Sequence, residues 1–389
     1  MTAPPPSRRV EALDVLRGIA ILGSLGTNIW LFTDPAGPSS GPNPPPYDSF
    51  PHGVEAFLSF LANGKFIALL TVMFGIGLEI QYRSARRRGT GWPGRYLWRA
   101  TLLFAEGLVH YVLIFEFDVL MGYAVASVVV AFLVGRTLQT INTWMYAAGG
   151  LHTALVLALA AIAQGPPANR TSRPDLFSAG SYLDQVQDRI DLWYVYRAES
   201  ILMLPMAVTL FLVGIRLWRA GVLIDDHVGA ALRKRLTVAG LGIGLPLNFA
   251  ATLLQQNNLI SRYLLAPVVA VGILAMVTTI VLRMSGAPGL LRRGVTALGR
   301  TALTGYILQN LLASILCYGW GLGLALTLAG SRPWWTIAAW ALLSAALMAF
   351  AALWLRRFGR GPVELFWDWA QRAPFSAGRK AATRTAPLG

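Results

Sequence analysis

Residues 334–356 read WWTIAAWALLSAALMAFAALWLR, and this stretch decides the fold class. It carries no charged side chain before its final residue, Arg356. The hydrocarbon core of a bilayer is about 30 Å thick, and a helix of about 20 apolar residues crosses it. The stretch is therefore long and apolar enough to cross a membrane as one helix.

Nine further apolar blocks precede this stretch, separated by segments rich in Arg, Pro and Gly. We therefore predict an all-α, polytopic transmembrane bundle of about ten spans. The first block is read as a retained span because no convincing small-residue cleavage site follows it. The expected spans are 12–32, 55–82, 96–115, 119–135, 143–164, 197–218, 236–256, 263–283, 301–325 and 334–356.

Composition supports a lipid-facing surface. The chain is 55% hydrophobic and 13% charged, whereas soluble proteins are about 25% charged. It has 33 Lys and Arg against 18 Asp and Glu, but the excess lies in short runs between apolar blocks, which argues against a nucleic-acid-binding patch. With one cysteine, Cys317, neither a disulfide framework nor a cysteine-based metal site can form, and we predict no metal.

The positions of Lys and Arg predict the orientation. With the N-terminus inside, the inner segments hold 24 of them and the outer segments hold 5. Cytoplasmic loops carry such an excess, so both termini are expected in the cytoplasm. We expect a cytoplasmic tail at 1–11, a transmembrane domain at 12–356 and a cytoplasmic tail at 357–389.

Two predicted outer loops are long, 33–54 and 165–196. Prolines in the first exclude an ordinary helix. The second part of the other loop favours an interfacial helix, with acids in water and aromatic rings at the headgroups. Each loop is either a lid over an outer site or a plain connector. The acids and rings are Asp184, Asp188, Asp191, Trp193, Tyr194 and Tyr196.

Polar residues inside spans are costly and are candidate functional residues. Asp14 and Arg17 lie three apart on one helix face, so they can pair with each other or with Glu79 or Arg83. They form either a structural ion pair or, through Arg17, a binding site for an anionic group. Asn28 is either a tie between helices or a donor to a substrate oxygen. Lys65 is close to mid-membrane, where it either snorkels or pairs with a carboxylate such as Glu106.

The third predicted span holds Glu106 and His110, four residues apart on one face. A carboxylate can hold a histidine in one tautomer and stabilise its protonated form, as a general base requires. The alternative is a packed core histidine. Asp118 follows in an acidic turn at the outer face, and His52, in the first outer loop beside Glu55, is a competing base.

The ninth predicted span presents Tyr306, Gln309 and Asn310 on one face, at spacings of three and four. These side chains either line a polar interior or tie packed helices together.

Several strings resemble the YeiB-like bacterial membrane proteins (domain of unknown function 418). The matches run in order from residue 11 to about 369. They are LDVLRGIAILG (13–23) with Asn28, NGKF (63–66), FGIG (74–77), GLVH (107–110) with DVL (118–120) and Tyr123, LGRTALT (298–304) with Tyr306 and Gln309, WLRRF (354–358) and GPVE (361–364).

That family is similar to multi-spanning acyltransferases, which include heparan-glucosaminide acetyltransferase and bacterial sugar O-acyltransferases. The resemblance implies transfer of an acyl group from acyl-CoA (acetyl-CoA) to a hydroxyl or amine, and it supports His110 with Asp118. One departure is Asn28, which stands where the O-acyltransferases have a histidine. The glucosaminide branch also has asparagine there and uses a histidine of the following outer loop, the region of His52.

The leading hypothesis is therefore a multi-pass acyltransferase of the bacterial plasma membrane, acting on a small molecule or envelope glycan. His110, assisted by Glu106 or Asp118, would be the base, and the arginine run at 83–95 would be one candidate for binding coenzyme A phosphates. The alternative is a transporter or exporter in which Lys65, Glu106 and His110 form a proton relay. A third is a non-catalytic accessory of an envelope assembly.

Overall fold

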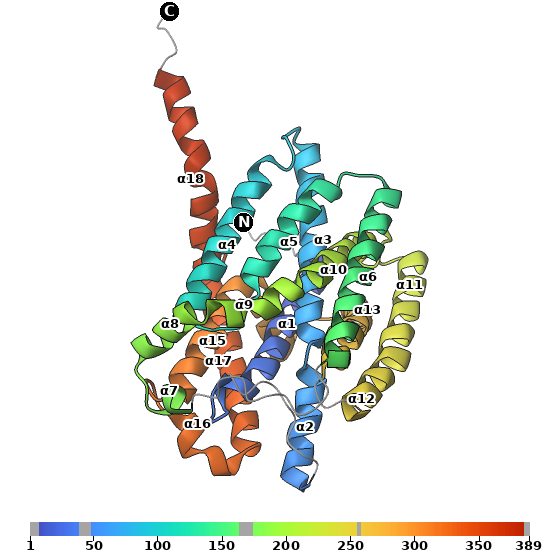
Figure 1. Cartoon of the computed structure of the whole chain (residues 1–389). Helices are drawn as coiled ribbons and strands as arrows, with labels where there is room; N and C mark the ends of the chain where they lie inside the picture. Colours follow the sequence, from blue (N-terminus) through green and yellow to red (C-terminus); the bar gives the residue numbers. More distant parts are fainter. Residues whose placement is uncertain (1–7, 39–47, 163–173, 255–257, 385–389) are drawn as a thin grey trace, which may run out of the picture.

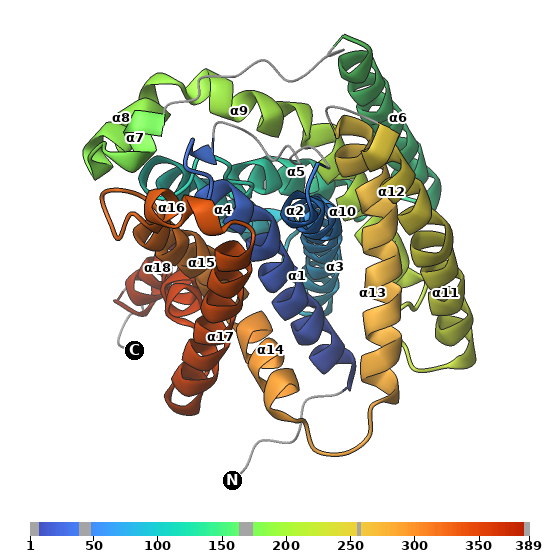
Figure 2. The same ribbon diagram turned by 90° about the horizontal axis from the view of Figure 1, so that it is seen from below.

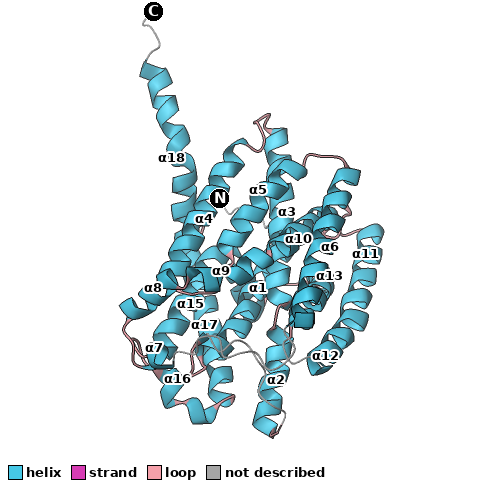
Figure 3. Cartoon of the chain, viewed as in Figure 1, coloured by secondary structure: helices cyan, strands magenta, loops and turns pink. Residues whose placement is uncertain are grey.

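The computed structural model of the chain describes residues 8–38, 48–162, 174–254 and 258–384. Helices joined by short turns make up this part of the chain, and no strand occurs in it (Figure 3). The all-α prediction is therefore confirmed. The outermost parts of both predicted tails, and residues 39–47 and 165–173 of the predicted outer loops, lie outside the described residues.

The bundle is organised around α1 (Arg8–Phe32), which contacts α3, α13, α14 and α17. Figure 2 shows α1 with α3 and α13 to one side and α14 and α17 to the other. Leu16, Leu25 and Ile29 are almost fully buried along it, as expected for a helix at the centre of a bundle. The partners are α3 (Lys65–Arg87), α13 (Ala266–Arg283), α14 (Leu290–Arg300) and α17 (Trp334–Arg357).

A helical hairpin and the C-terminal helices complete the core. α4 (Gly94–Leu113) packs against α5 (Leu120–Leu133), and α5 packs against α10 (Leu204–Arg219). α15 (Ala302–Cys317) lies against α1 and α17. α18 (Pro362–Arg384) contacts α4 and α15 and then projects from the bundle (Figure 1).

The remaining helices lie at the edges or in connections. The edge helices α6 and α11–α12 keep most of their apolar surface exposed, as lipid-facing helices do. α11 continues through a π-helical segment, Val238–Gly244, into α12. The bounds are α2 (Phe50–Ala62), α6 (Leu138–Ile162), α7 (Pro174–Ser178), α8 (Tyr182–Asp191), α9 (Trp193–Leu202), α11 (His227–Thr237), α12 (Leu245–Leu254) and α16 (Leu324–Thr327).

Six helices in the described part of the chain are long and apolar enough to cross a membrane, and the pair α9 and α10, bent by 40°, makes a seventh. Three expected spans are less clear. α5 and α15 are shorter apolar helices, and α4 carries Arg95, Arg99 and Glu106. The protein is a multi-pass membrane protein, while the total of ten spans and the cytoplasmic termini remain predictions.

The second expected span, 55–82, is interrupted. α2 ends at Ala62 and α3 begins at Lys65, with Gly64 between them in the left-handed conformation at φ 75°. A Cβ on Gly64 would lie 2.6 Å from the carbonyl oxygen of Arg262. Glycine therefore allows both the left-handed turn and the close approach.

Glycines bring α1 and α14 into direct contact. A Cβ on Gly18 would lie 2.1 Å from the carbonyl oxygen of Val295, and one on Gly299 would lie 1.7 Å from that of Asp14. Small residues permit this approach between membrane helices. The crossing brings Arg17 and Arg300, the immediate neighbours of these glycines, to one cavity.

Candidate functional site

His110 and Asp118 form a buried pair where α4 connects to α5, at the end of the hairpin that the Lys and Arg bias predicts to be the outer one. His110 Nδ1 lies 2.9 Å from Asp118 Oδ2, and the two side chains are 1% and 0% exposed. The other carboxylate oxygen of Asp118 accepts a hydrogen bond from the backbone N–H of Met121 at 3.2 Å. A carboxylate fixed in this way holds the imidazole in one orientation.

Two amides extend this pair into a chain of hydrogen bonds. Asn28 Nδ2 donates to Asn310 Oδ1 at 3.1 Å, and Asn310 Nδ2 lies 3.2 Å from His110 Nε2. If Nδ1–H of His110 donates to Asp118, then Nε2 of His110 accepts from the Asn310 amide. Every donor in this chain of hydrogen bonds then faces an acceptor. The arrangement favours the tautomer in which Nε2 carries a lone pair, which is the form of a general base.

The residues linked by these hydrogen bonds come from three elements. α1 contributes Asn28, the α4–α5 hairpin contributes His110 and Asp118, and α15 contributes Asn310. The Tyr306 ring, one turn before Asn310, lies 5.0 Å from the His110 ring. Gln309 donates instead to Ser24 at 3.1 Å, so it ties α15 to α1.

Glu106 does not pair with His110, although their spacing favours it. Its carboxylate accepts a hydrogen bond from Trp367 Nε1 of α18. The predicted pair of Lys65 with Glu106 is also wrong, because Lys65 Nζ donates to the carbonyl oxygen of Phe60 and lies over the Phe60 ring. Glu106 therefore bonds to a residue far along the chain, and Lys65 bonds to one only five residues away.

His52, the competing base, is not part of the hydrogen-bond chain that contains His110. It is in the first turn of α2, with Nδ1 2.5 Å from Asp48 Oδ1 and a side chain 43% exposed. Its hydrogen bond holds the pKa of the Asp48 carboxyl below the ordinary value. Its sequence neighbour Glu55 pairs with Arg332 at 2.6 Å. The structure thus brings no other member of the candidate site to His52.

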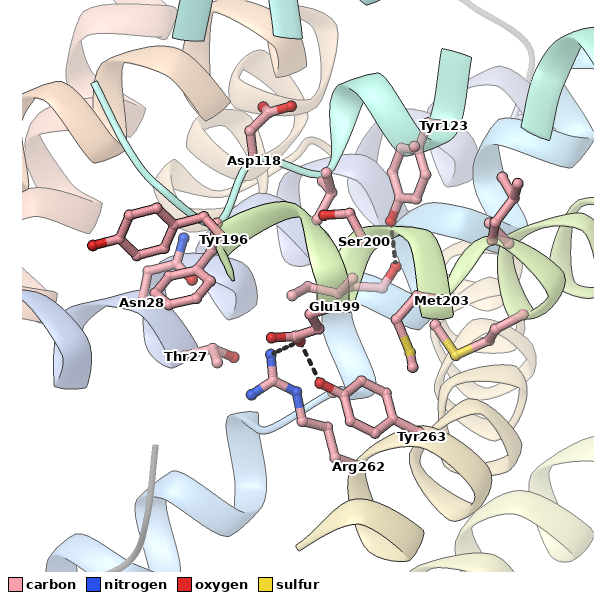
Figure 4. Close-up of a pocket in the computed structure, with 18 of the residues that line it drawn as sticks. Thr27, Asn28, Asp118, Tyr123, Tyr196, Glu199, Ser200, Met203, Arg262 and Tyr263 are labelled. Carbon is pink, nitrogen blue, oxygen red and sulfur yellow. Dashed lines mark hydrogen bonds and ion pairs between the residues drawn. The ribbon is translucent and has the colours of Figure 1, made fainter. Parts of the chain in front are cut away.

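Two cavities flank this chain of hydrogen bonds, and we name them inner and outer after the orientation that the Lys and Arg bias predicts. The inner cavity has a volume of about 680 Å³ and extends from Arg17 to Tyr306 and Leu120. The outer pocket is smaller, about 110 Å³, and Asn28, Asp118 and Tyr123 line it (Figure 4). His110 lies between them: its ring neighbour Tyr306 lines the inner cavity, and its carboxylate partner Asp118 lines the outer pocket.

The inner cavity carries a small excess of basic side chains. Four arginines line it, Arg17, Arg99, Arg300 and Arg360, together with three carboxylates, Asp14, Glu364 and Asp368. Arg17 pairs with Asp14 at 3.4 Å, as predicted, and Arg360 pairs with Asp368. Among the described residues, no carboxylate forms a salt bridge with Arg99 or Arg300. A cavity with two such guanidiniums is suited to phosphate groups, which arginine binds bidentately.

The outer pocket has an ionic cluster on one side. Glu199 of α9 accepts hydrogen bonds from Tyr263 and, at 3.3 Å, from Arg262 (Figure 4). The rest of the lining is largely apolar and aromatic, including Phe117 and Tyr196. A pocket with an apolar wall and few polar groups can fix the orientation of a small organic group.

Comparisons with known proteins match this chain to two bacterial proteins and one family model. Residues 217–373 match the family model described as "Protein of unknown function (DUF418)". The chain is 28% identical to "Uncharacterized protein YeiB" of Escherichia coli (strain K12), over 95% of this chain and 97% of the relative. It is 26% identical to "Uncharacterized protein YxaH" of Bacillus subtilis (strain 168), over 93% and 94%. No solved structure matches the chain.

The chain is therefore similar to the YeiB-like DUF418 proteins. The segment that matches the family model supplies Arg300, Tyr306, Asn310 and Arg360, whereas His110 and Asp118 precede it. The candidate site is thus assembled from both halves of the chain.

Sequence reasoning missed the residues that hold the Asp118 turn. Arg197 of α9 donates to the carbonyl oxygens of Glu116 and, at 2.9 Å, of Asp118, and its guanidinium lies 4.1 Å from the centre of the Tyr111 ring. Arg189 of α8 donates to Val112 at 3.2 Å. The only signal was that Arg197 is a charge within an expected span, which has a cost unless it is paired.

The predicted interfacial helix exists as α8 and the start of α9, but not all of its acids face water. Asp184 is exposed, whereas Asp188 is buried and accepts a hydrogen bond from the Tyr196 hydroxyl at 2.7 Å. The sequence also missed Arg99, Arg300 and Arg360 as cavity residues. In the described part of the chain, no group of three His, Cys, Asp or Glu side chains is arranged to hold a metal ion.

Proposed function

We propose that this protein is a membrane-embedded acyltransferase. It takes an acyl group from acyl-CoA in the inner cavity and transfers it to a hydroxyl or amine in the outer pocket. The observation that carries the proposal is the position of the His110–Asp118 pair, buried between a large cavity lined by four arginines and a small, largely apolar pocket. Such a pair is suited to general-base catalysis on an acceptor.

The donor site is assigned from charge and size. Coenzyme A carries phosphates, and Arg99 and Arg300 offer two guanidiniums that are not committed to carboxylates in the described chain. The arginine run at 83–95 is a weaker candidate, because none of its members lines the inner cavity. Tyr306 lies where the cavity approaches His110, so a thioester carbonyl oxygen at this end would receive a hydrogen bond from its hydroxyl.

The lone pair on His110 Nε2 indicates how the transfer step would proceed. The acceptor takes the place of the Asn310 amide at His110 Nε2, and its O–H or N–H proton moves to Nε2 as oxygen or nitrogen attacks the thioester carbon. Asp118 stabilises the imidazolium that forms. The carbon–sulfur bond then breaks, the acyl group stays on the acceptor, and the proton passes from His110 to the thiolate of coenzyme A.

One observation favours the alternative, a transporter. The span made of α2 and α3 is interrupted at Gly64, and α9 and α10 meet at a 40° bend; broken spans are typical of transporters. However, Lys65 and Glu106 bond to other partners, which disconnects the proton relay predicted for that function. We therefore place the transporter second.

The first test is acetyl-CoA binding, measured by calorimetry on the full chain in detergent. We expect saturable binding that Arg99→Gln with Arg300→Gln weakens by at least about tenfold, since a hydrogen bond to a charged group contributes about 1.5–3 kcal/mol. His110→Ala should keep the binding. A folded wild-type protein that binds neither acetyl-CoA nor longer acyl-CoAs would overturn the proposal and place transport first.

A further inference from the structure

A second basic pocket lies away from the candidate site, where the α3–α4 turn meets the end of α5. It has a volume of about 480 Å³ and shares no lining residue with the inner cavity. Arg86, Trp92 and Arg136 line it, together with the glycine-containing segment 89–91. Both arginines are exposed.

The charges of this pocket are unbalanced. No Asp or Glu lines it, and among the described residues no carboxylate forms a salt bridge with Arg86 or Arg136. Arg83, on the same helix, is by contrast committed to Glu79 at 2.7 Å. Two guanidiniums that share one pocket without a carboxylate are suited to one phosphate group.

The floor of the pocket is held by aromatic packing. Trp92 Nε1 donates to the carbonyl oxygen of Ala131 at 2.8 Å, and the Trp92 ring lies 5.4 Å from the Tyr82 ring. Gly89 has a φ of 66°, a left-handed turn that suits glycine and brings the segment over the pocket. Tryptophan and tyrosine are enriched where a protein meets lipid headgroups.

The surroundings favour a lipid over a soluble ligand. Phe132 of α5 lines the pocket and is 53% exposed, which provides an apolar wall beside the two arginines. The pocket also lies on the side that the Lys and Arg bias assigns to the cytoplasm, where the membrane surface is negatively charged. A phosphate joined to an apolar body matches both features.

We propose that this pocket binds the phosphate of an anionic phospholipid of the inner leaflet. Arg86 and Arg136 hold the phosphate, Trp92 and Tyr82 pack at the headgroup level, and Phe132 contacts the lipid chain. The site is independent of the acyl-transfer proposal and would serve a transporter equally well.

The test is native mass spectrometry of the full chain in detergent, titrated with phosphatidylglycerol and, separately, with zwitterionic phosphatidylcholine. The double variant Arg86→Gln, Arg136→Gln is compared with Arg87→Gln, Arg88→Gln, which removes the same charge from the same turn but outside the pocket. Each arginine near a membrane surface contributes about fivefold in affinity. We expect the pocket variant to lose roughly 20-fold for the first phosphatidylglycerol, and the control variant to keep it.

A competition arm separates a lipid from a soluble phosphate ester. Excess inorganic phosphate should leave phosphatidylglycerol bound to the wild-type protein, because the apolar contacts add to its affinity. Displacement by phosphate would overturn the lipid assignment. Equal losses in both double variants, each folded by thermal unfolding, would show that general charge rather than this pocket governs binding, and would overturn the site itself.

Discussion

Gly107 shows how the candidate site depends on a single missing side chain. A Cβ at this position would lie 2.9 Å from Asp118 Oδ1 and 2.7 Å from the backbone nitrogen of Met121. Only glycine therefore lets the Asp118 turn approach α4 closely enough to reach His110, which lies one turn further along the same helix.

Gly107→Ala should push the Asp118 turn away from α4 and lower the transfer rate by about 10²-fold, the usual effect of a displacement of about 1 Å in a catalytic group. The rate is measured as release of the coenzyme A thiol from acetyl-CoA. Gly150→Ala is the matched control, because a Cβ there meets nothing within 4 Å. Equal rates for the two variants would contradict the assigned role of the turn.

Arg197 supports the same turn from the outer side. Arg197→Gln removes the charged donor from the carbonyl oxygens of Glu116 and Asp118, and we expect lower thermal stability together with a lower rate of thiol release. Arg197→Lys should restore part of both. Arg233→Gln is a matched control, since Arg233 is also buried and donates to two carbonyl oxygens, at 3.0 and 2.6 Å.

The rate of thiol release, and not thermal stability, distinguishes Arg197→Gln from Arg233→Gln. Both should unfold at lower temperature, because each leaves buried carbonyl groups without a donor. Only Arg197→Gln should slow thiol release beyond the loss of folded protein. A similar slowing by Arg233→Gln would mean that Arg197 has a general structural role.

Sequence reasoning at the residue scale succeeded where partners are close in the chain. The pairing of Asp14 with Arg17, three residues apart, is confirmed. Helical spacing placed Glu106 beside His110, but it could not reveal that Trp367, far along the chain, binds Glu106. The link between His110 and Asp118 came from family resemblance, because the geometry of a turn is not visible in helical periodicity.

At the scale of elements, the crossing of α1 and α14 positions Arg17 and Arg300 in the proposed donor site. Gly299→Ala would place a Cβ 1.7 Å from the carbonyl oxygen of Asp14, so the two helices must separate. We expect a loss of stability of about 1–3 kcal/mol, the usual effect of overpacking, and weaker acetyl-CoA binding because Arg300 moves away from Arg17.

Thermal unfolding and calorimetry check this prediction. The control is Gly289→Ala at the start of α14, where a Cβ meets nothing within 4 Å. If Gly299→Ala lowered stability and left acetyl-CoA binding intact, Arg300 would not belong to the donor site.

Hydropathy locates a span but not the breaks within it. The apolar run 55–82 lies in one candidate span, Phe50–Arg87, as predicted, while the left-handed Gly64 and its contact with Arg262 divide that span into α2 and α3. The expected spans leave residues 284–300 unassigned, yet α14 forms there and its apolar face is buried, with Leu298 at 1% exposure.

At the scale of the whole molecule, the sequence predicted the bilayer but not the cavities. The length and spacing of the apolar blocks are enough to indicate a helical membrane bundle. The inner cavity is formed by arginines of α1, α4 and α14 and by Arg360, which approach one another only after the helices pack. Only the assembled bundle therefore places a buried histidine between the large inner cavity and the small outer pocket.

The most direct test of the acyl-transfer account is release of the coenzyme A thiol from acetyl-CoA by the reconstituted protein, supplied with a bacterial envelope fraction as acceptor. Wild-type protein should release thiol, and His110→Ala should bind acetyl-CoA equally well but release thiol at least about 10²-fold more slowly, because a general base contributes about 10²–10⁴-fold. Equal rates for wild type and His110→Ala, or no release by a wild-type protein that binds acetyl-CoA, would contradict the account.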